Sequence, residues 1–126
     1  MFSYYNPNPV GRRVGDCAVR AVSKALDVDW KVAYALLTAN GIILGDMPSS
    51  DSVINATLKQ KGFKRAVIPN TCPDCYTAGE FARDHPYGVY VLKLNNHVVA
   101  AEGGKLYDTW DSGGETVIYY WYREEY

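Results

Sequence analysis

The chain has 126 residues, a length that fits one domain spanning residues 1–126. Hydrophobic residues make up 48% and charged residues 21%, a balance that excludes an intrinsically disordered chain. The formal net charge is −1, from 13 basic and 14 acidic residues, so the basic excess of nucleic-acid-binding proteins is missing. We therefore expect no nucleic-acid partner.

The sequence also argues against a membrane partner. No apolar stretch is long enough to span a bilayer, and the first nine residues lack the basic segment and apolar core of a secretory signal. The three cysteines cannot all pair within one chain, and a core of this size needs no disulfides. These observations predict a cytoplasmic protein and leave its oligomeric state open.

The first half of the chain has helical patterning. Apolar residues at positions 18, 21, 22 and 25 follow helical spacing, and Asp16 is placed as an N-cap, which puts Cys17 in the first turn. A second helix is expected over residues 30–39, with Asp29 as its N-cap and the Asn-Gly pair at 40–41 as its stop. A third helix is expected to begin near residues 49–51 and to end at Gly62.

The second half reads mainly as strands. A short strand is expected over residues 64–69, and Thr77 and Glu80 form a capping box that starts a short helix ended by Pro86. Turn residues at positions 95–96, 103–104 and 112–114 then separate four apolar runs. The predicted fold class is α+β: N-terminal helices packed against a C-terminal four-stranded antiparallel β-meander.

The tight turn at Gly103-Gly104 predicts which residues face each other. It pairs positions 102 and 105, and by extension places His97 opposite Trp110 and residue 99 opposite Asp108. Asp108 is then diagonal to His97 on the same face, whereas Asp111 falls on the opposite face. This register favours Asp108 as the carboxylate that orients the imidazole.

These residues predict a candidate catalytic triad. A thiol at Cys17 faces the positive end of a helix dipole, which favours the thiolate, and a neighbouring His97 would lower the thiol pKa further. Asp108 would fix the tautomer of His97 and leave the other ring nitrogen to act as a base. Each residue also has a plain structural interpretation: Cys17 as a small buried hydrophobe, His97 as a polar residue beside a turn, and Asp108 as a strand-end cap.

The order of these motifs resembles the papain-like cysteine peptidases. The matching segments are Gly15-Asp16-Cys17-Ala18, then Asn96-His97-Val98-Val99, then Leu106-Tyr107-Asp108-Thr109-Trp110. The chain looks most similar to the compact C39-like group, which also occurs as small open reading frames in bacterial and phage genomes. The resemblance implies a helical half that carries the nucleophile, a sheet that carries the histidine and aspartate, and a cleft between them.

One departure from the family pattern concerns the oxyanion hole. The family usually has a glutamine about six residues before the cysteine, and here that position is Gly11. Asn6, Asn8 or a backbone amide near Gly11 is the expected substitute, and a missing donor predicts slow turnover. Two further residues are expected to support the triad: Asp16 beside the nucleophile and Trp110 beside His97.

Three functions follow from the sequence. The first is a cysteine hydrolase, meaning a peptidase, amidase or acyl transferase that acts on a peptide or protein substrate without a metal or cofactor. The second is a weak or inactive papain-like binding module, of phage origin, that captures a host factor or small ligand. The third is a small metal or redox protein built on Cys72 and Cys75, with Asp74 and His85 as further ligands.

Overall fold

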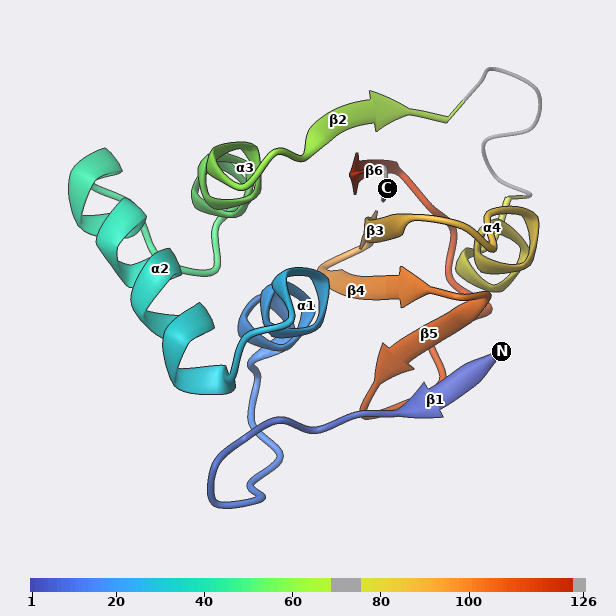
Figure 1. Cartoon of the computed structure of the whole chain (residues 1–126), viewed down its shortest axis with the longest axis horizontal. Helices are drawn as coiled ribbons and strands as arrows, with labels where there is room; N and C mark the ends of the chain where they lie inside the picture. The colour runs from blue at the N-terminus through green and yellow to red at the C-terminus, as the bar shows by residue number, and fades with distance from the viewer. Residues whose placement is uncertain (69–75, 124–126) are drawn as a thin grey trace.

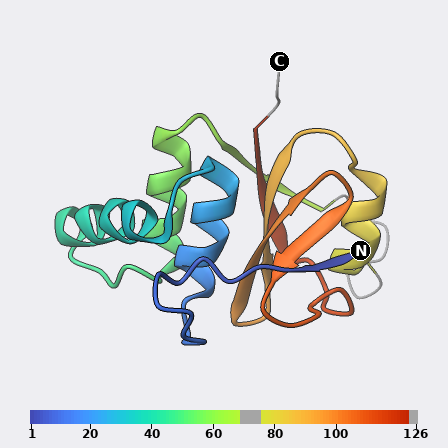
Figure 2. The same cartoon turned by 60° about the horizontal axis from the view of Figure 1, so that its bottom comes forward.

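The computed structural model describes residues 1–68 and 76–123, which form a mixed α+β fold. The sheet lies between two helical layers, with three helices on one face and one on the other (Figure 2). The three helices are α1 (Cys17–Leu26), α2 (Trp30–Leu44) and α3 (Asp51–Gln60), and the fourth is α4 (Ala78–Asp84). Two hydrophobic clusters fill the spaces above and below the sheet.

The sheet has six strands, which corrects the predicted four-stranded meander. The strands are β1 (Phe2–Tyr4), β2 (Lys64–Val67), β3 (Val89–Leu94), β4 (His97–Glu102), β5 (Lys105–Asp108) and β6 (Tyr119–Arg123). Their spatial order is β1-β5-β4-β3-β6-β2, and β1 pairs with β5 in parallel while the other pairs are antiparallel (Figure 1).

The meander was predicted correctly for its first three strands and wrongly for the last. Both tight turns form, with positive φ at Asn96, Gly103 and Gly104, and the pairing of Glu102 with Lys105 is confirmed. The fourth strand, β6, crosses back and pairs with β3 instead of β5. The physical reason is burial, because the inner position between β3 and β2 encloses Trp121 completely, whereas an edge strand would leave it half exposed.

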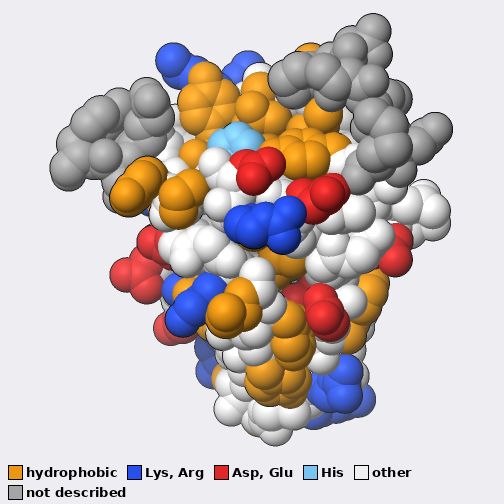
Figure 3. Space-filling view, turned by 90° about the vertical axis from the view of Figure 1, so that its right-hand side faces the viewer, with side chains coloured by type: hydrophobic (Ala, Val, Ile, Leu, Met, Phe, Trp, Pro, Cys, Tyr) orange, Lys and Arg blue, Asp and Glu red, His pale blue; other side chains and the backbone are white. Residues whose placement is uncertain are grey.

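The connection between β5 and β6 is therefore a long loop and not the expected hairpin turn. It passes the start of α4, where Thr77 and Thr116 form an isolated bridge and the amide of Gly79 donates to the carbonyl of Gly113 at 2.9 Å. The α4 side of the molecule carries interspersed acidic and basic side chains next to hydrophobic ones (Figure 3). No single-sign charge patch dominates that face.

The helix starts follow their capping residues. Asp29 accepts from the amide of Val32, Ser50 caps α3, and the capping box of Thr77 and Glu80 forms as predicted. Asp16 occupies the N-cap position of α1, but its carboxylate makes no capping hydrogen bond. Its side chain is engaged elsewhere, as described below.

Helix α2 runs past the predicted stop and ends at Leu44. Asn40 is buried in the helix and bonds Thr57 of α3 at 2.8 Å, so its amide serves packing between helices. A Cβ at Gly41 would lie 2.7 Å from the carbonyl oxygen of Asp46, so this glycine permits the following loop to pack closely. The Asn-Gly pair therefore marks a close contact, and Gly45 in the left-handed conformation ends the helix.

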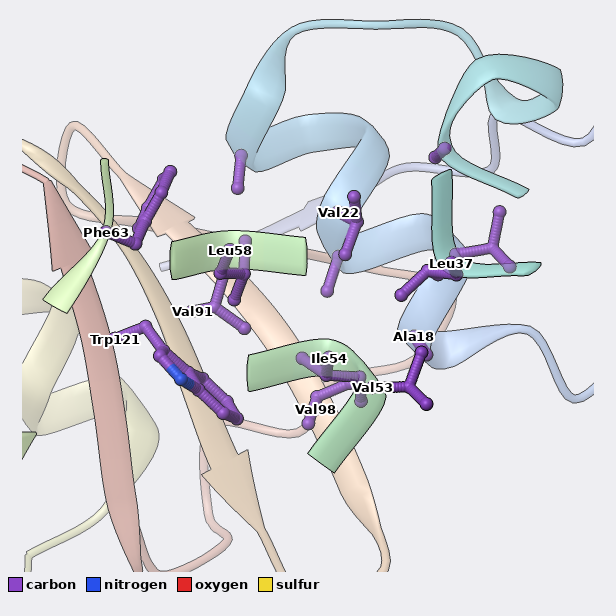
Figure 4. Packing of buried hydrophobic residues seen from close by; sticks show 14 of the residues in the cluster. Ala18, Val22, Leu37, Val53, Ile54, Leu58, Phe63, Val91, Val98 and Trp121 are labelled. Carbon is purple, nitrogen blue, oxygen red and sulfur yellow. The ribbon is translucent and has the colours of Figure 1, made fainter. Parts of the chain in front are cut away.

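The larger cluster lies between α1–α3 and the sheet, and it fixes where α1 begins. Val22 of α1 and Leu58 of α3 are completely buried in one cluster with Val91 and Trp121 of the sheet, and Leu37 of α2 is buried on the side of that cluster away from Trp121 (Figure 4). Cys17 is partly buried at the edge of the same cluster. Core packing thus holds the amino end of α1 against β4.

Candidate active site

Cys17 is the first residue of α1 and is partly exposed. The amides at this helix start have no intrahelical acceptor and point their positive ends toward the thiol. His97 and Val98, both in β4, line the same pocket as Cys17 and lie close enough to the thiol to lower its pKa. The structure therefore brings the predicted nucleophile and the predicted base together.

His97 contacts Asp108 on its other side. Its Nε2 lies 2.7 Å from Oδ2 of Asp108, whose side chain is completely buried. The β4–β5 ladder runs from Glu102 paired with Lys105 to Ala100 paired with Tyr107, so both residues lie just beyond its last pair. Because Nε2 faces the carboxylate, Nδ1 is the nitrogen that remains for Cys17.

The carboxylate of Asp108 is held by three further donors. Ser112 donates to Oδ2 at 2.8 Å, and the amide of Thr109 donates to Oδ1 at 2.8 Å. Arg20 donates to Oδ1 at 3.0 Å. These bonds fix the orientation of the carboxylate and favour its charged form.

Arg20 links this acid to a second one, Asp16. Its guanidinium bonds Asp16 at 2.5 Å and Asp108 at 3.0 Å, and the residue is only 4% exposed. The other oxygen of Asp16 accepts from the indole of Trp30 at 2.8 Å. A continuous buried network therefore connects the start of α2, through α1, to the imidazole of β4.

The pKa shifts follow from these contacts. Burial opposes ionisation of the thiol, but hydrogen bonds to His97 and Val98 and the charges of His97 and Arg20 hold the pKa of Cys17 below its usual value. Burial also disfavours the imidazolium, yet hydrogen bonds to Asp108 and Cys17 raise the pKa of His97 to about 9.

The acid completes this charge arrangement. Burial opposes ionisation of Asp108, but its bonds to His97 and Ser112 keep its pKa below the usual range. At neutral pH these directions favour a thiolate, an imidazolium and a carboxylate in sequence. Such an arrangement can attack an electrophilic carbon and deliver a proton to a leaving group.

Trp110 covers the imidazole, as the predicted register requires. The two ring centroids are 4.8 Å apart, and Trp110 is 42% exposed. The indole therefore forms a partial lid over the pair formed by His97 and Asp108. Asp111, placed on the opposite face by the same register, accepts from the amide of Gly113 and shapes the following turn.

Asn6 and Asn8 are engaged within the N-terminal loop. The amide of Asn6 donates to the carbonyl of Arg12 at 3.3 Å, and Oδ1 of Asn8 accepts from the amides of Val10 and Arg12 at 3.0 and 3.2 Å. Gly11 has a φ of 73° within this loop. These bonds shape the loop, and the structure brings neither asparagine side chain into hydrogen bonding with Cys17 or His97.

A polar pocket of about 310 Å³ opens directly over the thiol. An ion pair of 3.1 Å between Lys93 and Asp51 borders it, and Asn96 of the β3–β4 turn lies on its rim. The complete lining is Gly15, Cys17, Ser49, Asp51, Ile54, Lys93, Asn96, His97 and Val98. Cys17 and His97 therefore line a pocket that is open to solvent.

Sequence reasoning missed several of these residues. Arg20 sits among apolar residues of a helix, and only its contact with the distant Asp108 shows its role. Trp30 and Ser112 bond the two acids, and neither lies in a recognisable motif. Asn96 was predicted as a turn residue and as part of the segment Asn96-His97-Val98-Val99, but its place at the pocket was not predicted.

Other features bear on cofactors and membranes. Within residues 1–68 and 76–123, no group of three or more histidine, cysteine or acidic side chains is arranged to hold a metal ion. In the same part of the chain, no helix is long and apolar enough to cross a bilayer. Cys72, Asp74 and Cys75 lie outside the described residues, and His85 stacks on Phe81 with ring centroids 3.9 Å apart.

No family model, curated protein or solved structure matches this chain. The papain-like relationship therefore remains a prediction from short motifs. The chemistry of the site has to be argued from its own geometry.

Proposed function

We propose that this protein is a cysteine hydrolase of papain-like type that cleaves or transfers the acyl group of a peptide or related amide. The observation that carries the proposal is the arrangement of Cys17 and His97 around one pocket, with His97 held by the buried Asp108 at 2.7 Å. A cysteine that is only a small core residue has no need of a partly exposed position, a pocket above it and an imidazole oriented by a buried acid. The depressed pKa of Cys17 supports the same conclusion.

The proposed reaction has two halves. The thiolate of Cys17 attacks the substrate carbonyl carbon, and the C–N bond breaks as Nδ1 of His97 gives its proton to the leaving amine. This leaves a thioester on Cys17. A water molecule then gives a proton to Nδ1 and attacks the thioester, which releases the acid and restores the thiolate. Asp108 accepts from Nε2 throughout and stays ionised.

The oxyanion needs donors, and the residues around the pocket suggest two. The first is the backbone amide of Cys17 at the open start of α1. The second is the side-chain amide of Asn96, which borders the same pocket and takes the place we expected for Asn6 or Asn8. Replacing Asn96 by glycine keeps the positive φ of this position and should lower kcat by about 10²-fold. Asn95→Gly in the same turn is the matched control and should leave kcat unchanged.

The nucleophile is best tested by alkylation in a Cys72→Ser/Cys75→Ser background, where Cys17 is the remaining thiol. Iodoacetamide should modify Cys17 at pH 6 at least ten times faster than it modifies a free model thiol, because the lowered pKa of Cys17 increases the fraction of thiolate. His97→Ala should remove this advantage. Equal rates for Cys17 and the model thiol, with no effect of His97→Ala, would contradict the hydrolase.

The alternative is a papain-like binding module, and Gly11 in place of a glutamine is the feature that favours it. It predicts an unreactive Cys17 and tight capture of a ligand in the pocket. For the hydrolase, a reducing cytoplasm is the proposed setting, since the thiol must remain reduced to act.

A further inference from the structure

A second pocket adjoins the one above Cys17. It has a volume of about 290 Å³ and shares Gly15 and Ser49 with the first. Its walls are largely apolar and include Val14, Trp30 and Pro48. The two pockets therefore lie on either side of the short segment that leads into the nucleophile.

A third pocket continues in the same direction. It has a volume of about 400 Å³ and shares Pro48 with the second. Ile42 and Met47 line it, and they are 77% and 68% exposed. Shared lining residues thus connect the nucleophile to an exposed apolar surface at the far end of α2.

The two outer pockets form one groove, which we call the α2 groove. One wall is a single face of α2, because Trp30, Tyr34, Thr38 and Ile42 follow each other at four-residue spacing. The other wall is the segment 45–49, which runs back beside α2 toward α3 (Figure 1). The rise from Trp30 to Ile42 is about 18 Å, the length of an extended peptide of about five residues.

The side chains that line the two outer pockets indicate which class of ligand these pockets can bind. The two outer pockets contain no Lys or Arg, so they offer no partner to a phosphate or an acidic side chain. Their two carboxylates are already bonded, Asp16 to Arg20 and Asp46 to Ser52. Both pockets are open to solvent and their largely apolar linings include a few polar residues, which suits side chains of a peptide better than an acyl chain that needs a closed apolar tunnel.

We propose that the α2 groove binds an extended segment of a polypeptide substrate, with large apolar side chains on one side of the amide attacked by Cys17. The proposal rests on the proposed function for the position of the cleaved bond. The aromatic pair of Trp30 and Tyr34, with ring centroids 5.0 Å apart, takes an apolar side chain near the cleaved bond. Ile42 and Met47 take a second one farther along.

A peptide library derived from a digested proteome tests the preference, with new amino termini identified by mass spectrometry. Large apolar residues should be enriched at two or more of about five positions on one side of the cleaved bond. For the best peptide, Tyr34→Ala and Ile42→Asp should each lower kcat/KM roughly tenfold. Tyr87→Ala and Val67→Asp replace comparably exposed apolar residues away from the groove and should change kcat/KM less than twofold. Cleavage without apolar preference, or equal effects of the four variants, would overturn the proposal.

A binding experiment tests the α2 groove independently of catalysis by Cys17. Immobilised Cys17→Ala protein should retain apolar peptides of the same library, and Ile42→Asp in that background should weaken their retention roughly tenfold. If the Cys17→Ala protein retains peptides that the wild type does not cleave, the proposed hydrolase function is contradicted and peptide binding by the α2 groove is supported. If no peptide is retained, peptide binding by the groove is contradicted. Faster acylation of Cys17 by p-nitrophenyl decanoate than by the acetate, with no peptide preference, would assign the groove to an acyl chain and overturn the proposal.

Discussion

Nε2 of His97 lies 2.7 Å from Oδ2 of Asp108, and this short contact joins a partly exposed base to a completely buried acid. The acid cannot turn away, because Arg20, Thr109 and Ser112 also bond it. The imidazole is therefore presented to Cys17 in one orientation. Substitutions at this contact and around it are therefore expected to affect the hydrolytic rate and the free energy of unfolding to different degrees.

Asp108→Asn should lower the hydrolytic rate at least about 100-fold, because an amide cannot hold the imidazolium or select its tautomer. The pKa of His97 should fall from its raised value of about 9, since the hydrogen bond and charge of Asp108 help to raise it. A pH titration of the imidazole by NMR measures this shift. Asp111→Asn is the matched control, because that carboxylate accepts a hydrogen bond from the amide of Gly113 in its turn and lies outside the network around His97. An unchanged pKa of His97 in Asp108→Asn would contradict the proposed role.

Arg20→Met should destabilise the protein by about 3–5 kcal/mol, because it leaves two buried carboxylates without their cation. It should also raise the pKa of Cys17, to whose lowering the charge of Arg20 contributes. Urea unfolding measures the first effect, and the pH dependence of alkylation measures the second. Arg12→Met removes an exposed cation and should change stability by less than about 0.5 kcal/mol. If Arg20→Met lowers the free energy of unfolding by less than about 1 kcal/mol, the buried network contributes little to stability.

Cys17→Ala should make stability fall with rising pH above about 6.5, the ordinary pKa of histidine. In the wild type, folded His97 keeps a proton in this range that the unfolded chain has released, while folded Cys17 has released one that the unfolded chain keeps. These two differences in bound protons have opposite effects, so the free energy of unfolding of the wild type should vary little with pH. Without the thiol, the part of the histidine difference that Asp108 maintains remains, and its stabilisation is lost as pH rises through the folded pKa. Urea unfolding between pH 6 and 9 checks this, and parallel curves for both proteins would rule out the ion pair.

Trp110→Ala should slow hydrolysis by up to about tenfold, since the indole no longer contacts the imidazolium. Trp110→Phe keeps an aromatic face and should restore most of the rate. Ile118→Ala, at a residue of similar exposure, is the control for loss of apolar surface. Stability of Trp110→Ala should change little because the ring is 42% exposed. No recovery with Trp110→Phe would assign Trp110 a purely structural role.

Local patterns were enough to predict the parts of the site that depend on neighbouring residues. The turn at Gly103-Gly104 sets the register of β4 and β5, and this placed His97, Asp108 and Trp110 on one face before any coordinates were known. The start of α1 at Cys17 followed from helical spacing.

The rest depends on contacts between distant segments. Arg20 looks like any helical arginine until α1 packs on the sheet and brings it to Asp108. Asp16 has the sequence position of a cap, yet a charged partner one turn away and the indole of Trp30 compete successfully for its oxygens. The predicted position of β6 was wrong for a similar reason. Its position in the sheet depends on the burial of Trp121 and not on the residues of the local turns.

The docking of α1 on β4 has a consequence for synthesis of the protein. Cys17 leaves the ribosome long before His97 and Asp108 do, and the nascent thiol therefore has an ordinary pKa until the sheet assembles behind it. The environment that lowers the pKa of Cys17 arises only after β4 and β5 have been synthesised and the core has closed. The alkylation rate of Cys17 should therefore report on completed folding.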